Sequence, residues 1–210
     1  MAKQKFYVVW DGHEPGVYSS WSEAKQQIDG YPQAKYKSFS SKAEAEKAYR
    51  GSYWAYVGKD TKSVKKSLPE LEKIGVRLDS LAVDAACSGN PGDMEYRGVH
   101  TKTGQEIFRV GPLPDGTNNV GEFLALVHGL AWLKQQNSPN IPIYSDSRNA
   151  QLWVKAKKCR TKLANTGRNA EIFQLIERAE KWLAINKVTN PIIKWETEAW
   201  GEIPADFGRK

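Results

Sequence analysis

The sequence is poor in cysteine and histidine. Its 210 residues include two cysteines, Cys87 and Cys159, and three histidines, His13, His100 and His128. The two cysteines have no metal-ligand spacing and provide no disulfide framework. A zinc site is therefore not expected, and a reducing, cytoplasmic compartment is the expected location.

Long apolar runs are also absent. No stretch of the sequence approaches the roughly 18 consecutive apolar residues that a membrane span requires. The first residues, Met1–Phe6, include two lysines and form no apolar segment of the signal-peptide type. We therefore expect no membrane partner. The length allows one large domain, or a medium domain with a small one.

Basic and aromatic residues, by contrast, are plentiful. Lysine and arginine number 31 against 24 acidic residues, which gives a formal net charge of +7. This balance favours a polyanionic partner. The eight tryptophans and nine tyrosines suit stacking on bases or sugars, although aromatic residues in most proteins belong to the core.

The first fifty residues form a compact pattern of strands and helices. A serine, Ser20 or Ser22, can cap a helix that runs to about Ile28, and Ser40 or Ser41 can start a second helix. Alternating segments predict three strands, at Lys5–Trp10, Gly16–Ser19 and Lys35–Phe39. The pattern predicts a small β-β-α-β-α domain over residues 1–52.

Two further regions follow. Residues 53–77 include the polar segment Thr61–Ser67, which has no periodicity and predicts a linker. Residues 78–210 predict a larger domain whose strands and helices alternate, the pattern of an α/β fold with a mixed sheet. Its strands are expected at Leu78–Ala86, Gly104–Gly111, Ile141–Ser145 and Pro191–Trp195, and its helices at Val120–Lys134 and Glu171–Ala184.

Three acidic residues stand in apolar surroundings. Asp84 lies within an apolar strand, Asp146 follows another, and Glu122 shares a helix face with Ala125 and Leu126. Buried charge is costly unless it is compensated. Three converging carboxylates would attract a divalent cation, and oxygen ligands favour Mg²⁺ or Mn²⁺. Singly, each acid has an ordinary structural explanation as a helix-dipole partner or a turn former.

Four segments resemble the motifs of type 1 ribonuclease H, in the same order and at similar spacing across residues 78–210. They are Asp84–Gly92 (DAACSGNPG), Thr117–Glu122 (TNNVGE), Tyr144–Ser147 (YSDS) and Pro204–Asp206 (PAD). Each segment alone is a weak signal, whereas the four together are specific.

This resemblance implies a fold, a reaction and a cofactor. The fold is a ribonuclease H-like five-stranded mixed sheet flanked by helices. The reaction is hydrolysis of the RNA strand of an RNA–DNA hybrid, which leaves 5′-phosphate and 3′-hydroxyl ends. Two Mg²⁺ ions, with Mn²⁺ as the alternative, would be held by four acids acting in metal binding and catalysis. These acids are Asp84, Glu122, Asp146 and Asp206.

The resemblance also implies substrate-binding residues. The ribose 2′-hydroxyl, which marks RNA, would be recognised by Glu122 and by the segment Cys87, Ser88, Gly89 and Asn90. Asn118 resembles a residue that contacts nucleic acid, while Thr117 and Asn169 resemble parts of a pocket for a DNA phosphate. The basic run Lys155–Lys162 has five cations and no acid. It favours phosphate attraction, with a solvated helix face as the alternative.

The first fifty residues resemble the hybrid-binding, caulimovirus viroplasmin-like domain attached to many ribonucleases H. The matching segments are Phe6–Tyr7, Gly16–Trp21 and Tyr31–Phe39. The resemblance places Trp21 and Tyr36 against deoxyribose and Lys37 against phosphate, and Tyr7 and Phe39 are further site residues of this domain. The alternative is that Trp21 and Tyr36 form the core of a small domain. Some relatives have two adjacent lysines where this sequence has Lys37-Ser38.

The sequence departs from the family pattern before its last acid. The family has a histidine in a loop there, but residues 194–206 contain none, which leaves Glu196, Glu198 or Glu202 as substitutes. Only four residues follow Asp206, where the family has a final helix. Two other functions therefore stay open. One is a non-catalytic protein that binds hybrids or double-stranded RNA, and the other is a nuclease that acts on DNA.

Overall fold

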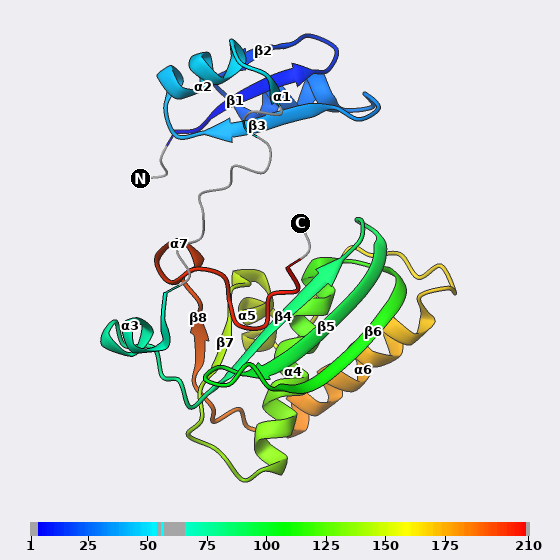
Figure 1. Ribbon diagram of the computed structural model, residues 1–210. Coiled ribbons are helices and arrows are strands. Elements are labelled where there is room, and N and C mark those ends of the chain that lie inside the picture. Colours follow the sequence, from blue (N-terminus) through cyan, green and yellow to red (C-terminus); the bar gives the residue numbers. More distant parts are fainter. Residues whose placement is uncertain (1–3, 54–55, 57–65, 209–210) are drawn as a thin grey trace. The chain divides into compact units, whose positions relative to one another are not determined.

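The computed structural model describes residues 4–53, 56 and 66–208 (Figure 1). The chain divides into two compact units, Met1–Lys62 and Ser63–Lys210. Each unit has its own sheet and its own buried core. None of the helices in the described part is long and apolar enough to cross a membrane.

The smaller unit contains a three-stranded antiparallel sheet in the order β2-β1-β3. Both of its helices begin at serine caps, Ser20 and Ser41, whose hydroxyls accept a hydrogen bond from the backbone three residues on. The elements are β1 (Phe6–Asp11), β2 (Gly16–Tyr18), α1 (Trp21–Ile28), β3 (Lys35–Phe39) and α2 (Lys42–Tyr49). The predicted β-β-α-β-α order is confirmed.

Alternation along β1 divides the small sheet into two faces. Val8 packs against Ala45 and Ala48 of α2, and this core is completed by partly buried aromatic residues. Tyr7, the neighbour of Val8, lies on the opposite face, where its ring contacts Trp21 at the start of α1. One face of the sheet therefore forms the core with α2, and the other presents aromatic rings.

The larger unit contains a five-stranded sheet in the order β6-β5-β4-β7-β8. Three strands are antiparallel neighbours: β4 (Leu81–Cys87), β5 (Gly92–His100) and β6 (Glu106–Gly116). The other two, β7 (Ile143–Ser145) and β8 (Ile192–Lys194), run parallel to β4. The mixed five-stranded sheet predicted for residues 78–210 is confirmed.

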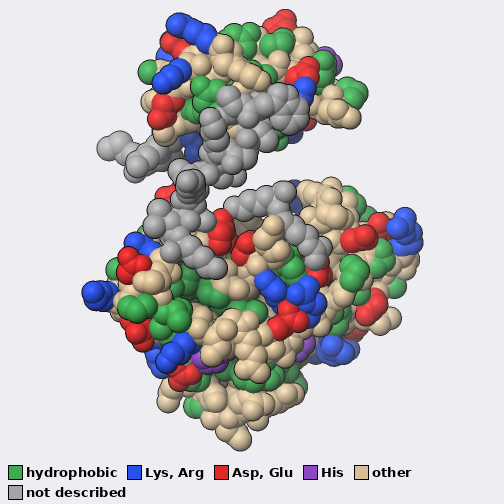
Figure 2. All heavy atoms as spheres, in the orientation of Figure 1, with side chains coloured by type: hydrophobic (Ala, Val, Ile, Leu, Met, Phe, Trp, Pro, Cys, Tyr) green, Lys and Arg blue, Asp and Glu red, His purple; other side chains and the backbone are tan. Residues whose placement is uncertain are grey.

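Helices α4 (Asn118–Gln135), α5 (Arg148–Lys155) and α6 (Ala170–Ile185) share the main core with one face of this sheet. The opposite face is covered by α3 (Leu68–Lys73), α7 (Thr197–Trp200) and the segment after it, in a second buried cluster. Strand β4 serves both clusters, because Leu81 and Val83 face the first and Ala82 faces the second. The visible surface of this unit carries acidic and basic side chains intermixed (Figure 2).

Helix α4 lies unusually close to the sheet. A Cβ atom at Gly121 would be 2.8 Å from the Cβ of Ala85, and one at Gly129 would be 2.5 Å from the Cδ1 of Ile143. Both separations are shorter than any normal carbon contact, so the helix can approach β4 and β7 this closely only because both positions are glycine.

The structure differs from the expected linker at residues 66–77. Helix α3 occupies part of that range, and Leu71 and Val76 are buried in the second cluster. The sequence carries a helix start there, because Ser67 and Glu70 have the spacing of a capping box, with Pro69 between them in the first turn. Residues 57–65 of the expected linker lie outside the described part. The domain boundaries at 52 and 78 stay a prediction.

Candidate active site

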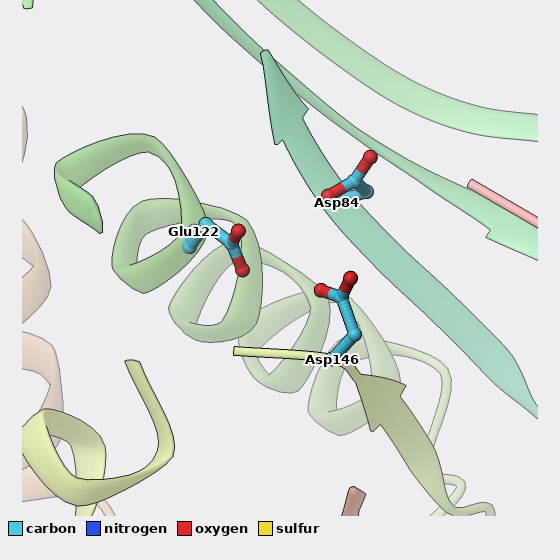
Figure 3. Close-up of side chains that lie close together, drawn as sticks. All are labelled: Asp84, Glu122 and Asp146. Atoms are coloured by element: carbon cyan, nitrogen blue, oxygen red, sulfur yellow. The ribbon is translucent and has the colours of Figure 1, made fainter. Parts of the chain in front are cut away.

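Three carboxylates converge at one edge of the larger sheet (Figure 3). One oxygen from each of Asp84, Glu122 and Asp146 can be chosen so that all three lie within 4.8 Å of one another. Strand pairing causes this. Ala82 pairs with Tyr144 in parallel register, so two residues further on Asp84 and Asp146 come side by side. Glu122 reaches them from the first turns of α4, which packs on β4.

The electrostatics of this cluster are unfavourable without a counter-ion. Burial, then the nearby Asp146 and Asp206, raise the pKa of Asp84 to about 7. Burial, then Asp146 and Asp84, raise the pKa of Glu122 to about 9. Burial also raises the pKa of Asp146. Desolvation and like-charge repulsion thus act on all three groups in the same direction.

The donor set fits a hard divalent cation. Glu122 Oε2 and Asp146 Oδ1 are buried and have no hydrogen-bond partner among the described residues. The lone pairs of these two oxygens can therefore coordinate a cation. Among the described residues, the only such group of potential ligands consists of carboxylates, without histidine or cysteine. Oxygen-only coordination is typical of Mg²⁺, Mn²⁺ and Ca²⁺.

Asp206 lies at the same cavity, as the sequence predicts. The cavity has a volume of about 850 Å³ and is lined by Asp206 together with the three clustered acids. Three predicted substrate-binding residues also line it, namely Cys87, Ser88 and Asn118. The amide of Asn118 donates a hydrogen bond of 2.9 Å to Glu122 Oε1, which orients the carboxylate. Gly89 is exposed beside this cavity and does not line it.

A second cavity, of about 530 Å³, contains other predicted residues. Asn90, Thr117 and Asn169 line it, together with Arg160 and Lys162 of the basic run. Asn169, which the resemblance makes part of a phosphate pocket, lies in the wall of this cavity. It is fully buried, its Nδ2 donates to the carbonyls of Asp115 and Ala164, and its Oδ1 accepts from the backbone of Thr166. Its side chain therefore shapes the cavity wall.

The basic run does not act as one surface. Arg160 and Lys162 face the second cavity, whereas Lys158 forms an ion pair with Glu180 of α6. Lys155 and Lys157 line a different depression between α5 and β8. The run is neither a continuous helix face nor a single patch, because α5 ends at Lys155 and the chain then changes direction.

One of the three candidate substitutes for the family's histidine reaches the acidic cavity. Glu202 lines it with Asp146, whereas Glu196 and Glu198 do not. Glu202 also contributes to the raised pKa of Asp146. From the sequence alone the three glutamates were equally good candidates. Only the path of the chain after α7 shows which of them reaches the cavity.

Three aromatic side chains form a row on the smaller unit, which we call the aromatic row: the half-buried Tyr7 and the exposed Trp21 and Tyr36. The ring centroids are 5.4 Å apart for Tyr7 and Trp21 and 5.7 Å apart for Trp21 and Tyr36. Trp21 and Tyr36 are each 43% exposed. Such exposure is uncommon for rings of this size, so the alternative that these two belong to the core is not what the structure shows.

Lys37 and Phe39 lie on the other face of β3 from Tyr36. Phe39 packs against Trp10 and Tyr56 in the core, which differs from its expected place in the binding surface. The Nζ of Lys37 donates a hydrogen bond of 2.8 Å to the carbonyl of Tyr56. The physical reason is the two-residue period of the strand, which separates residues 37 and 39 from residue 36.

Comparison with known proteins gives the family. The RNase H family model matches residues 79–195, more than half of the chain, and the model described as the Ribonuclease H1 N-terminal domain matches residues 5–49. The chain therefore belongs to the ribonuclease H family. Its smaller unit is similar to the N-terminal domain of Ribonuclease H1.

Individual relatives match one part of the chain or the other. Ribonuclease H of Saccharomyces cerevisiae is 50% identical over 46 residues, which span 21% of this chain and 13% of that protein. Ribonuclease H of Legionella pneumophila is 31% identical over 111 residues, 51% of this chain and 72% of that protein. The crystal structure of RNase H1 from Halobacterium salinarum matches at 19% identity with a TM-score of 0.35, covering 57% of this chain and 88% of that one.

We expect Gly121→Ala to alter the cation requirement of the site. The added methyl would meet Ala85 and push α4 outward, carrying Glu122 away from Asp84. A wider site suits Ca²⁺, whose oxygen ligands lie at about 2.4 Å, better than Mg²⁺ at about 2.1 Å. Calorimetric titration of each ion should show Mg²⁺ affinity reduced more than Ca²⁺ affinity.

Gly129→Ala is the matched control for this change. It overpacks the same helix against Ile143 and Leu81, two turns beyond Glu122, and should cost a similar stability of about 1–3 kcal/mol. Equal changes in cation affinity for the two variants would contradict the role given to Gly121.

Proposed function

We propose that this protein is an endonuclease that hydrolyses the RNA strand of RNA–DNA hybrids, leaving 5′-phosphate and 3′-hydroxyl ends. Two Mg²⁺ ions, or Mn²⁺ in their place, would be held by Asp84, Glu122, Asp146 and Asp206. The observation that carries this proposal is the convergence of three carboxylates, of which Asp84 and Glu122 are buried and Asp146 is half-buried. One oxygen of Glu122 and one of Asp146 have no hydrogen-bond partner among the described residues. The family assignment supports it independently.

The ligand residues are placed by rigid elements. Asp84 is in the central strand β4, Asp146 follows the neighbouring strand, and Glu122 is held by α4 and by the amide of Asn118. When bound, the divalent ions lower the pKa of the attacking water and stabilise the leaving oxygen. Because the pKa of Glu122 is raised to about 9 without a counter-ion, its carboxyl group gives up a proton when cations bind near neutral pH.

Selection of RNA would take place at the mouth of the acidic cavity. Ser88 and Asn118 present a hydroxyl and an amide there, beside Glu122. These groups match the 2′-hydroxyl, which both donates and accepts hydrogen bonds. The second cavity would accept a phosphate of the DNA strand, because Arg160, Lys162 and Thr117 supply donors on its walls.

The smaller unit would hold the hybrid through the aromatic row. Ring faces of Trp21 and Tyr36 are open to solvent and suit contact with deoxyribose. Joining this unit to the nuclease unit in one chain makes the second contact intramolecular, which raises avidity without new chemistry. The Ribonuclease H1 N-terminal match over residues 5–49 supports this assignment.

The proposal is tested with three labelled duplexes of one sequence: RNA–DNA hybrid, double-stranded RNA and double-stranded DNA, each with Mg²⁺ and with EDTA. We expect Mg²⁺-dependent cleavage of the RNA in the hybrid alone. Hybrid binding without cleavage would instead favour a non-catalytic binding protein, and cleavage of the DNA duplex would favour a DNA nuclease.

Trp21→Ala should weaken hybrid binding while leaving the acidic cavity intact. Loss of one aromatic contact to nucleic acid costs about 1–3 kcal/mol, so the dissociation constant should rise by roughly 5- to 150-fold. Fluorescence anisotropy of a labelled hybrid in Ca²⁺ measures it. The matched control is Tyr49→Ala, which removes an aromatic ring of similar exposure, 40%, from α2 outside the aromatic row. Equal losses in both variants would contradict the proposed role.

A further inference from the structure

The fourth acid is positioned differently from the other three. Asp84, Glu122 and Asp146 are in or next to regular elements, whereas residues 201–208, which contain Asp206, form no helix or strand. The segment is anchored before Asp206 by Ile203 and Ala205, which are buried in the second cluster. The amide of Asp206 donates a hydrogen bond of 2.8 Å to the carbonyl of Ile203. The carbonyls of this irregular segment have no helix or strand partner and need contacts from elsewhere.

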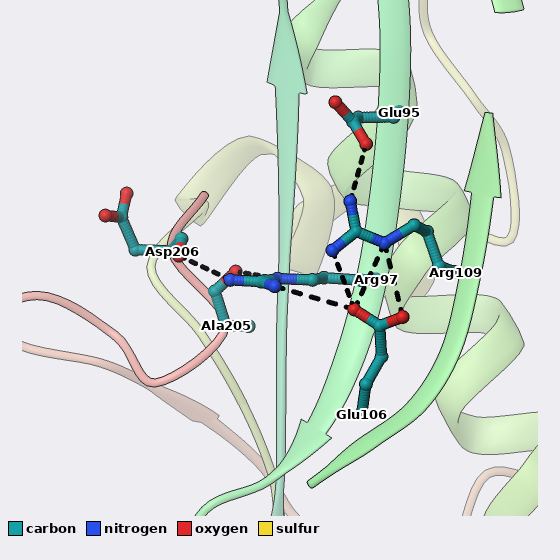
Figure 4. Close-up of polar contacts among 6 residues, drawn as sticks. All are labelled: Glu95, Arg97, Glu106, Arg109, Ala205 and Asp206. Carbon is teal, nitrogen blue, oxygen red and sulfur yellow. Dashed lines mark hydrogen bonds and ion pairs between the residues drawn. The ribbon is translucent and has the colours of Figure 1, made fainter. Parts of the chain in front are cut away.

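Arg97 makes the contacts that hold this backbone (Figure 4). Its Nε donates a hydrogen bond of 2.8 Å to the carbonyl of Ala205. Its Nη2 donates one of 2.6 Å to the carbonyl of Asp206. The guanidinium also lies 4.6 Å from the ring centre of Phe207. Three consecutive residues are therefore held by one side chain, whose planar fork can reach two carbonyls at once.

The Asp206 carboxylate is left outside this arrangement. Figure 4 shows it pointing away from the guanidinium, and neither of its oxygens is bonded to Arg97. Within the described part of the chain, only its Oδ2 has a hydrogen bond, from the backbone of Gly208 at 2.9 Å. Arg97 thus bonds the main chain and not the carboxylate of Asp206. That carboxylate stays available for a cation at the cavity.

The strand register gives Arg97 a place beside the acidic cluster. Arg97 pairs with Asp84 across β4 and β5, so the two side chains emerge on the same face of the sheet. Glu106 lies 3.5 Å from Nη1 of Arg97 and limits the positions of its guanidinium from the side opposite Asp206. The backbone of Arg97 is therefore held in the sheet, and its guanidinium is held by its contacts with neighbouring residues.

We infer that Arg97 is the positioning residue that holds Asp206 at the acidic cavity, so that the fourth carboxylate can share a divalent cation with the other three. The inference rests on the proposed function, in which Asp206 is a metal ligand. Arg97 itself touches neither metal nor substrate in this scheme. It acts through the backbone of residues 205 and 206.

The test is equilibrium binding of Mn²⁺ to the full chain, measured by electron paramagnetic resonance and by calorimetry without substrate. Arg97→Met and Arg97→Lys should each weaken binding of one ion by roughly tenfold, because neither side chain can bond both carbonyls. Arg109→Met is the matched control. It removes a guanidinium that also lies against Phe207, at 5.2 Å, and that bonds Glu95 and Glu106. It should leave Mn²⁺ binding within twofold of the original.

A double-mutant cycle with Asp206→Asn separates positioning from general loss of structure. In that background, Arg97→Met should cause no further loss of Mn²⁺ affinity, since the carboxylate it positions is gone. A full additional loss there, or unchanged binding in both Arg97 variants when thermal melting shows them folded, would overturn the inference. If Asp206→Asn itself left Mn²⁺ binding unchanged, the metal role of Asp206 in the proposed function would fail, and the inference with it.

Discussion

Asp84→Asn should reduce cleavage of an RNA–DNA hybrid by at least about a thousandfold, a barrier increase of about 4 kcal/mol. Asp84 stands on the central strand within reach of both Glu122 and Asp146, and the nearby Asp146 and Asp206 contribute to its raised pKa. The amide keeps the size of the side chain but removes the charge that would hold the cations. Asp146→Asn should have an effect of similar size.

Hybrid affinity should be nearly unchanged in both variants, because the aromatic row and the second cavity are untouched. Asp93→Asn is the matched control, since Asp93 is an exposed acid that lines the same cavity without belonging to the carboxylate cluster. Single-turnover cleavage and anisotropy binding, measured side by side, give both quantities. Near-normal cleavage by Asp84→Asn would refute the metal assignment.

The second prediction with a large expected effect concerns the free energy of unfolding in the absence of divalent cations. The pKa of Asp84 is raised to about 7 and that of Glu122 to about 9, so the folded protein keeps protons that the unfolded chain has lost. Stability is then full below the unfolded pKa of about 4 and falls as pH rises towards the folded values. In EDTA, we expect the melting temperature to decrease steadily between about pH 5 and 9.

Two comparisons test this assignment by differential scanning calorimetry. Mg²⁺ should restore stability most strongly at the alkaline end, where the carboxylates repel one another most. Asp84→Asn in EDTA at pH 8 should be more stable than the unaltered protein by about 1–3 kcal/mol, since removing one buried charge relieves both desolvation and repulsion. A less stable Asp84→Asn protein under those conditions would contradict the electrostatic account.

Much of the catalytic unit could be predicted from the sequence because its central elements are strongly patterned. Apolar runs marked β4 and β7, helical periodicity marked α4, and acids inside those runs marked Asp84 and Asp146 as unusual. The convergence of the acids followed from the expectation that the two strands are neighbours, and the observed pairing of Ala82 with Tyr144 confirms it.

Some missed features depend on long-range contacts, whereas others had a local pattern. Strand β5 was not predicted, although residues 93–97 alternate between polar and apolar side chains, the pattern typical of a strand. Without β5 there was no reason to connect Arg97 with Asp206. Phe39 was included among the site residues although it packs against the core, because aromatic residues of a core and of a binding surface look the same in sequence. Helix α5 was missed because it is short.

The hydrogen bonds from Arg97 to the carbonyls of Ala205 and Asp206 also affect the order in which the acidic cavity is assembled during folding. The hydrogen bond from Arg97 to Asp206 joins residues 109 positions apart, so its formation closes a very long loop at a high entropic cost. Contacts of that kind are expected after the strands between them have paired. Asp84, Glu122 and Asp146 would then come together first. Asp206 would join them only after the rest of the larger unit is stable enough to offset the added charge repulsion.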